Sequence, residues 1–524
     1  MDSARLAEAT LGGPAGDGAF PGLRDRRHLV AFVVGCAAVT AGVLLHLPMY
    51  WMGRGNGFRL ADMEMDAPML WGMAAILVGT VLAGWGLLPT SHLKAPRIDV
   101  AVPDQPRLGR AHYKLMLVLT GALVIDVMKP ASLGFVLPGM RAEYDLDTLT
   151  VAWLPFAALC GTVVGSIVWG VLADIFGRRS SILLSSVMFV GTTICGAMPS
   201  FTWNIGMCFL MGAAAGGMLP VTYALLAETM PARHRGWVLV LVGGLGSVGG
   251  YLAASLAAAW LEPILSWRAL WFLNLPTGLA LIALSVLIPE SPRFLLRIGR
   301  REEARKTLAR FGSVLREDGA AATAPTLPAS VPRALLPMTI ALSVCGLAYG
   351  LINFGVLLWL PAHMVSLGHS VTWTGTLLAA SALIALPTVL IAAWLYGRWR
   401  SKASMLGALV FTALGLGGVI YAQAGDSSAF VWLACVALLV VGSNAILAML
   451  LPYAAESYPV ATRGRAVGWI AACTKLGGPL SQGLTLLGMV PSLGSAAVVT
   501  ALVTLVALGL IAAFCIETRH HAVA

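Results

Sequence analysis

The sequence predicts an all-α integral membrane protein, and two observations support that fold class. Of the 524 residues, 58% are hydrophobic and only 11% are charged, and the mean hydropathy is +0.84. A soluble domain carries about 25% charged residues. The apolar residues also gather in runs of about 20, the length of a helix that crosses the hydrocarbon core of a bilayer. A soluble globular fold is therefore excluded.

These runs predict about fourteen spanning helices. In chain order they lie near residues 28–50, 68–88, 113–138, 149–172, 180–200, 203–226, 237–260, 268–289, 334–360, 370–395, 404–423, 430–452, 465–488 and 495–515. The eight cysteines all fall inside these apolar runs without CxxC spacing, so we expect neither a disulfide framework nor a zinc site.

The basic residues predict the orientation of the chain. Lys and Arg recur in alternate loops, whereas the opposite loops hold only Arg54, Arg59 and Arg141. The positive-inside rule then predicts that both termini lie in the cytoplasm. We expect the protein itself to lie in the inner membrane of a bacterium. The net charge of +10 follows from anchoring against an anionic lipid surface, so the bilayer is the expected partner and nucleic acid is not.

Loops and tails divide the chain into seven segments. We expect a disordered tail (1–27), a transmembrane hairpin (28–88), a polar linker (89–112), a six-helix bundle (113–289), a basic cytoplasmic loop (290–333), a second six-helix bundle (334–515) and a short tail (516–524). Apolar and charged residues alternate at helical spacing early in the basic loop. This pattern predicts an amphipathic helix on the inner membrane surface, followed by a flexible linker over 318–332.

Two short stretches in the two bundles have nearly the same sequence. AETMPARHRG (227–236) and AESYPVATRG (455–464) both contain Glu-x-x-Pro-x-x-x-Arg-Gly, each just past the end of a long apolar segment. A charged motif at matching places in two halves indicates an internally duplicated membrane protein, which is typical of transporters.

The loop GVLADIFGRR (170–179) resembles the signature of the major facilitator superfamily. Together with the repeated motif, PESPRFL (289–295) and AGGMLPVTYALLAE (215–228), it is similar to the branch of sugar porters, organic-ion transporters and synaptic-vesicle proteins, over residues 113–518. The resemblance implies two pseudo-symmetric six-helix bundles and a cytoplasmic gate of ion pairs that opens when the bundles rock. The gate residues are Gly170, Asp174, Gly177, Arg178, Arg179, Glu228, Arg235, Glu290, Arg293, Glu456 and Arg463. The alternative is that the arginines only obey the positive-inside rule.

The second half departs from this pattern. Its equivalent loop reads AWLYGRWRSK, with Gly397 where the family has Asp and Arg400 where it has Gly. We therefore expect an asymmetric gate, in which Asp174 of the first half has the larger part.

Charges inside the predicted spans are the best guide to the transported substrate. Only Asp126, Lys129 and Lys475 lie near the middle of a span. Asp126 and Lys129 share a face of one helix. One acid and two bases leave a surplus positive charge, which favours an anionic substrate such as a carboxylate, with Asp126 as the proton carrier. The alternative is a static Asp126–Lys129 pair that only holds helices together.

Polar and aromatic residues in the helices expected to line the path are candidates for the substrate cavity. They are Tyr223, Tyr349, Asn353, Trp359, Ser443, Asn444 and Gln482. Each of them alone is also compatible with helix–helix packing.

The N-terminal hairpin carries a possible soft-metal site. His46, Met49 and Met52 are spaced three apart, and Met63 and Met65 follow before the next span. Such side chains bind Cu(I), but Met near a membrane interface also serves for packing. A docking or assembly role for the hairpin is the stronger alternative, and no metal is assigned.

We expect a secondary active transporter of a small organic solute, most simply an organic anion entering with protons, by alternating access. The sequence contains no P-loop, HExxH or GxSxG, so we expect neither an enzyme nor a cofactor. We expect the proton gradient to be the energy source and a monomer to be the functional unit. The alternatives are a proton-antiporting exporter of drugs or metal chelators, a copper importer that uses the hairpin, and a transport-dead sensor or assembly protein.

Overall fold

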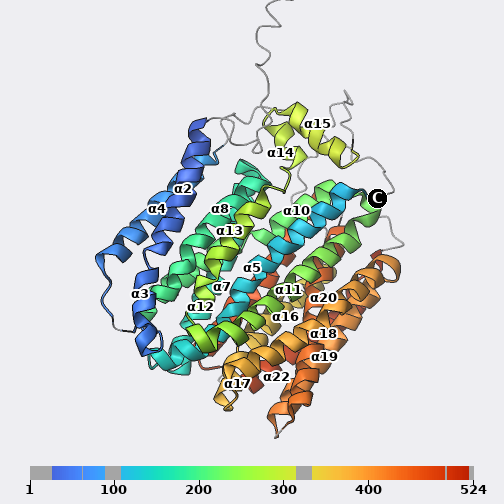
Figure 1. The fold of residues 1–524 in the computed structure, drawn as a ribbon. Helices are drawn as coiled ribbons and strands as arrows, with labels where there is room; N and C mark the ends of the chain where they lie inside the picture. Colours follow the sequence, from blue (N-terminus) through green and yellow to red (C-terminus); the bar gives the residue numbers. More distant parts are fainter. Residues whose placement is uncertain are drawn as a thin grey trace, which may run out of the picture.

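All regular structure in the described part of the chain is helical (Figure 1). The computed structural model describes residues 26–61, 63–88, 108–313, 333–425, 427–458, 460–489 and 492–518, and only the backbone for Asp174, Ala232, Val460, Ala461, Arg463 and Gly464. The predictions for the tail before Arg26, for most of the linker 89–112, for the segment 318–332 and for the last six residues lie outside the described residues. The all-α prediction is confirmed.

Twelve described segments are long and apolar enough to cross a membrane. The main helices are α2 (Arg26–Leu44), α4 (Ala67–Gly86), α5 (Arg110–Glu143), α7 (Trp153–Phe176), α8 (Arg178–Gly191), α9 (Phe201–Ala215), α10 (Met218–Thr229), α11 (Ala232–Leu265), α13 (Asn274–Ser285), α16 (Leu336–Leu351), α18 (Val371–Arg398), α19 (Ser401–Gln423), α20 (Ala429–Ser457), α21 (Val460–Leu486) and α22 (Leu493–Phe514). The twelve do not include α13, which is short, or α21; with these two, the arrangement matches the expected fourteen.

Short helices complete the connections between the spans. They are α3 (Leu47–Met52), η1 (Gly53–Asn56), α6 (Thr148–Val151), η2 (Thr192–Ala197), α12 (Ala269–Phe272), α14 (Pro292–Arg297), α15 (Arg301–Arg310), η3 (Arg333–Leu335), the π-helical turn η4 (Ile352–Leu357) and α17 (Leu360–Ser366). Several helices begin at a side-chain cap. Asp147 accepts a hydrogen bond from the backbone of Thr150 (2.8 Å), and Ser370 accepts one from Trp373 (3.1 Å). Such caps satisfy amide groups that have no partner within the helix.

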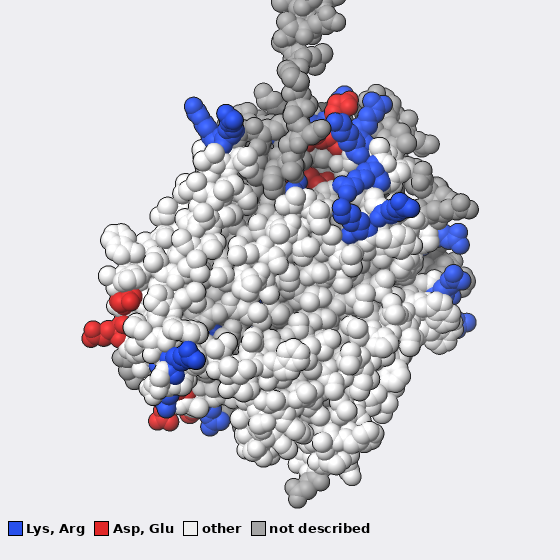
Figure 2. Space-filling model, viewed as in Figure 1, with Lys and Arg blue, Asp and Glu red and all other residues white. Residues whose placement is uncertain are grey.

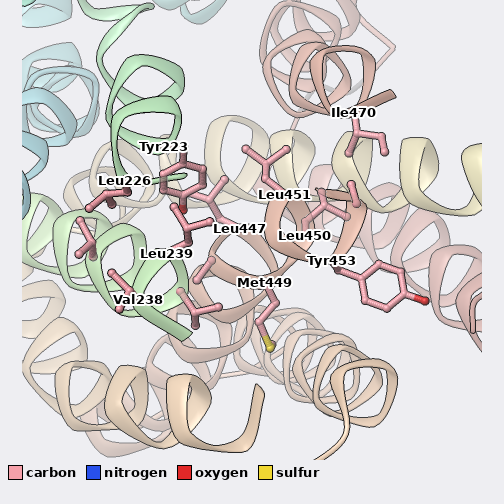
Figure 3. Packing of buried hydrophobic residues seen from close by; sticks show 14 of the residues in the cluster. Tyr223, Leu226, Val238, Leu239, Leu447, Met449, Leu450, Leu451, Tyr453 and Ile470 are labelled. Atoms are coloured by element: carbon pink, nitrogen blue, oxygen red, sulfur yellow. The ribbon is translucent and has the colours of Figure 1, made fainter. Parts of the chain in front are cut away.

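The helices form two bundles that pack against each other. The first contains α5 to α13 and the second contains α16 to α22. Helix α11 of the first packs along α18 and α20 of the second, and α7 packs on α21. Two apolar clusters both draw residues from the two bundles, and in one of them Tyr223 and Leu239 lie beside Leu447 (Figure 3).

Basic residues gather at one end of the molecule, around α14 and α15 (Figure 2). We call this the basic end and the opposite one, where α17 lies, the far end (Figure 1). The predicted amphipathic helix is present as these two short helices, because the chain turns at Gly299, which has a φ of +79°. Their apolar side chains Leu295, Leu296 and Ala304 pack together, and most of their arginines are exposed.

The N-terminal hairpin packs on the outside of the first bundle. Its helices α2 and α4 lie so close that a β-carbon at Gly35 would meet the backbone of Ala83 at 2.6 Å, as is common for small residues at membrane helix contacts. On the other side the hairpin shares an apolar cluster with α8 and with partly buried residues of α12 and α13. It is therefore part of one packed body with the first bundle.

Candidate functional site

A central cavity of about 110 Å³ lies between the two bundles. Both halves line it, through α5, α7 and α11 on one side and through α16, η4, α20 and α21 on the other. Its polar lining residues are Asp126, Thr162, Ser247, Tyr251, Tyr349, Asn353, Asn444, Thr474 and Lys475, and its aromatic lining also includes Phe135 and Phe354. The cavity therefore combines one acid, one base, several hydrogen-bonding groups and aromatic rings.

The structure separates the three charges that the sequence predicts at mid-membrane. Asp126 and Lys475 line the central cavity from opposite bundles. Lys129 does not line it: this side chain is buried and places its ammonium group over the ring of Phe189, 2.8 Å from the centroid. Asp126 has no ion-pair partner within 4.0 Å among the described residues. A tight static Asp126–Lys129 bridge is therefore not what the structure contains.

A hydrogen bond joins the two bundles at the cavity wall. The hydroxyl of Ser247 on α11 donates to the side-chain carbonyl of Asn444 on α20. Asn444 donates in turn to the backbone carbonyl of Val440 at 2.8 Å, so its orientation is set within its own helix. The two bundles are thus hydrogen-bonded to each other at the wall of the central cavity.

Three of the seven predicted cavity residues line the central cavity, and four do not. Tyr349, Asn353 and Asn444 line it. Trp359 donates to the side chain of Gln482 at 3.0 Å, and Gln482 donates to the carbonyl of Phe354, so this pair ties α21 to η4 and to the start of α17.

Tyr223 and Ser443 are the other two predicted residues outside the central cavity. Tyr223 is buried in the apolar cluster toward the basic end, and Ser443 is buried within α20 and donates to Val440 at 3.4 Å. Both therefore serve helix packing in this conformation.

Sequence reasoning missed four polar lining residues: Thr162, Ser247, Tyr251 and Thr474. Ser247 and Tyr251 lie one turn apart on α11, within and just after the glycine-rich stretch GGLGSVGG. A hydroxyl next to glycines, where helices approach closely, is the signal that would have identified Ser247.

At the basic end, Glu228 and Glu290 hold the predicted gate residues of the first bundle together. Glu228 lies 3.8 Å from the guanidinium of Arg178 and accepts from the hydroxyl of Ser291. Glu290 accepts from the backbone amides of Arg178 (2.7 Å) and Arg179 (3.3 Å). Burial raises the pKa of Glu290, while these amides lower it.

Two further gate residues belong to the same network. Arg179 donates to the backbone carbonyl of Ser285 at 3.0 Å. Gly177 has a φ of +97°, and a β-carbon there would meet the Glu290 carboxylate at 2.6 Å, so only glycine fits. The described contacts of this network thus lie inside the first bundle.

In the second bundle, Glu456 lies at the contact between the halves. Its carboxylate accepts from the hydroxyls of Tyr396 (2.8 Å) and Thr518 (2.9 Å), and a β-carbon at Gly236 of the first bundle would meet it at 2.8 Å. Arg235 donates to the carbonyl of Met230 at 3.5 Å. The side chains of Asp174 and Arg463 lie outside the described residues, so their predicted roles stay predictions.

Two further predicted gate residues, Arg293 and Gly170, lie in open surroundings. Arg293 is exposed on α14, and a β-carbon at Gly170 would have no neighbour within 4 Å. At Gly397, where the family signature has Asp, a β-carbon would lie 3.0 Å from the Cβ of Trp237 on α11. The loss of the acidic residue therefore coincides with close packing of the two bundles.

A buried carboxylate at the far end, that of Glu143, connects the hairpin to the first bundle. Glu143, at the end of α5, lies 2.6 Å from the guanidinium of Arg268, and both side chains are buried. The carboxylate also accepts from the indole of Trp267 (3.0 Å) and from the amides of Leu60 (2.7 Å) and Ala61 (3.1 Å) in the hairpin loop. Neither member of this pair was predicted as a functional residue from the sequence.

The proposed soft-metal residues of the hairpin differ in their surroundings. His46 and Met49 are buried, and the Nδ1 atom of His46 lies 2.8 Å from the carbonyl of Gly42, whereas Met52 and Met63 are exposed and Met65 is half-buried. Among the described residues, no group of three or more His, Cys, Asp or Glu is arranged to hold a metal ion.

Comparison with known proteins agrees with this architecture. Residues 119–482 match the sequence model of the Major Facilitator Superfamily. The niacin transporter NiaP of Acinetobacter baylyi is 25% identical over 390 residues, 71% of this chain and 86% of that protein. The benzoate transport protein of the same species is 24% identical over 403 residues, 73% of this chain and 84% of that protein.

A solved structure has the same fold. The xylose transporter XylE from E. coli, in a partially occluded inward-open conformation, superimposes with a TM-score of 0.64 at 17% identity, covering 79% of this chain and all of that one (100%). At this identity the likeness concerns the fold alone.

Proposed function

Because this chain belongs to the Major Facilitator Superfamily of membrane transporters, as its loop motifs predict, we propose that it carries a small organic anion across the membrane together with protons. The observation that supports this most directly is the central cavity, where Asp126 and Lys475 face the same space from opposite bundles. A charge at mid-membrane costs at least about 2.5–3.5 kcal/mol, so functional use is the usual reason for its presence.

The cavity chemistry favours a carboxylate attached to an aromatic ring. Lys475 supplies a positive charge, and Asn353 and Asn444 supply amide groups for hydrogen bonds. Phe135, Phe354 and two tyrosines line the remainder, and flat rings pack well against aromatic side chains. Relatives named for niacin and benzoate transport carry substrates of this kind.

In this proposal Asp126 carries the coupled proton. The proton on Asp126 and the bound anion have opposite charges, so together they add no net charge to the cavity. The loaded carrier can therefore pass through its closed state without an extra buried charge. Emptying toward the basic end releases both. The hydrogen bond between Ser247 and Asn444 has to break during this step, because it joins the moving halves.

The proposal places the basic end in the cytoplasm. The exposed arginines of α14 and α15 lie there, and the positive-inside rule assigns such an end to the inner face of a bacterial inner membrane, with both termini on that side. Cysteine accessibility to an impermeant thiol reagent in intact cells and in inverted vesicles tests this orientation.

The test of function is uptake into proteoliposomes with an imposed pH gradient. Wild-type protein accumulates labelled benzoate or nicotinate against a gradient when the outside is acidic. Asp126→Asn abolishes accumulation but retains exchange of labelled for unlabelled anion, because the binding cavity remains while the proton carrier is lost. Glu302→Gln, an exposed carboxylate on α15, is the matched control and transports like wild type.

Full accumulation by Asp126→Asn refutes the proton-carrier role. Accumulation that occurs only when the vesicle interior is acidic, so that protons leave as the anion enters, indicates an antiporting exporter and refutes symport.

A further inference from the structure

A second cavity lies at the far end of the molecule. Its volume is about 220 Å³, and both bundles line it. Arg141 at the end of α5 and Thr148 on α6 come from the first bundle. His363 on α17 and Ser492 at the start of α22 come from the second. Nothing in the proposed transport cycle so far uses this space.

A wall one helix thick separates this cavity from the central one. The two cavities share no lining residue: Phe354 and Leu358 face the central cavity, whereas Gly355 and Trp359 face the far one. The wall contains the π-helical turn η4, a feature often found at functional sites. The hydrogen bond from Trp359 to Gln482 fixes the wall to α21. The far cavity is therefore a separate site and not an extension of the central one.

The groups around the far cavity suit an anion. Arg141 supplies a guanidinium, which binds carboxylates in a forked geometry, and His363 supplies an imidazole. Helix α22 is 22 residues long and begins at Leu493, which also lines the cavity, so its N-terminal dipole favours negative charge. No carboxylate occurs among the lining residues described. The nearby Asp147 is turned to its own helix, where it caps α6.

We propose that the far cavity is a second binding site for a small carboxylate anion, held between Arg141 and His363. The choice of carboxylate rests on the proposed function, because the same anion would pass this site on its way to the central cavity. Since both bundles contribute groups, an anion bound here joins their far ends and favours the state in which that end is closed. High outside concentrations of substrate then slow transport.

Calorimetric titration of benzoate into the purified full-length protein in lipid nanodiscs tests the proposal. Wild type shows two binding events. Arg141→Gln removes one of them and Lys475→Met removes the other. Arg141 is exposed, so its replacement is compatible with folding, and His363→Gln is a second variant that weakens the same event. Arg54→Gln, an exposed far-end arginine outside the cavity, is the matched control and retains both events.

The outcomes separate this proposal from the proposed function. A single event that Lys475→Met removes and Arg141→Gln leaves unchanged overturns the far site and supports the central one. A single event that only Arg141→Gln removes overturns the central site. No benzoate binding by the wild type overturns both assignments for aromatic carboxylates. In transport assays, relief of inhibition at high benzoate by Arg141→Gln supports the far site, and unchanged inhibition contradicts it.

Discussion

Asp126 has two basic neighbours that differ in what they face. Lys475 lines the central cavity from α21, whereas Lys129, one turn along α5 from Asp126, lies over the ring of Phe189 inside the first bundle. A cation over an aromatic face gains about 0.5–2 kcal/mol, which stabilises Lys129 in a position outside the central cavity. In the proposed function, Lys475 therefore binds the charge of the substrate, and Lys129 has only a supporting position.

This difference leads to a prediction for binding affinity. Lys475→Met removes a charge-assisted contact worth about 1.5–3 kcal/mol, so the Kd for benzoate rises roughly 10- to 100-fold. Lys129→Met changes the Kd less than threefold, because its side chain lies outside the cavity. Competition binding with labelled benzoate measures both values.

The uncharged analogue benzamide is the control for this prediction, since it has no carboxylate for Lys475 to bind. Its affinity changes little in either variant. An equal loss of benzoate and benzamide binding in Lys475→Met shows that the lysine supports the cavity walls and contradicts the charge assignment.

At the scale of residues, the sequence was most informative where a side chain is rare in its surroundings. The rarity of charges at mid-membrane singled out Asp126, Lys129 and Lys475, of which Asp126 and Lys475 line the central cavity and Lys129 does not. Neutral residues were harder, because each step along a helix rotates the side chain by about 100°. Asn444 therefore faces the cavity while its neighbour Ser443 is turned into the bundle, and composition does not distinguish them.

At the scale of elements, the hairpin depends on one carboxylate. Glu143 is the acceptor for two amides of the hairpin loop and the partner of the buried guanidinium of Arg268. Arg268 also donates to the carbonyls of Gly196 and Met198 (both 3.0 Å). Hydrogen bonds and one ion pair thus join the far ends of the α2–α4 hairpin, α5, α8 and α11. The hairpin is expected to move with the first bundle when the halves rock.

Glu143→Gln tests this network. It leaves the buried Arg268 without a compensating charge, which costs about 3–5 kcal/mol of folding free energy. The midpoint of thermal unfolding in detergent falls by several degrees. Glu64→Gln replaces an exposed carboxylate in the loop between the two hairpin helices. It is the matched control and leaves the midpoint unchanged. A midpoint for Glu143→Gln within one degree of wild type contradicts a stabilising role of the ion pair.

The sequence predicted the hairpin as an element but not its attachment. Glu143 and Arg268 lie at the ends of apolar runs, 125 residues apart, where charges are ordinary. Only the packing of α5 against the α11–α12 turn brings them together and excludes water. Ser266 in that turn has a φ of +64°, a left-handed backbone conformation that is not predicted for a serine.

At the scale of the whole molecule, glycines mark where the two bundles meet at each end. At the far end, a β-carbon at Gly134 on α5 would lie 3.3 Å from the Cγ of Pro361 and closer still to the backbone carbonyl of Leu358. At the basic end, a β-carbon at Gly397 on α18 would lie 3.0 Å from Trp237. Larger residues at these two positions separate opposite ends of the same interface.

The two substitutions therefore have opposite effects on alternating access. Gly134→Leu forces the far ends apart and shifts the population toward the state open at that end. Gly397→Leu does the same at the basic end. Spin labels placed in pairs across each end, measured by double electron–electron resonance, report longer far-end distances in the first variant and longer basic-end distances in the second. Gly407→Leu, at a helix position with open space around it, is the control and keeps the wild-type distances. If both variants lengthen distances at the same end, the bundles do not rock as rigid bodies about a central site, and the assignment of Gly134 and Gly397 to opposite gates is wrong.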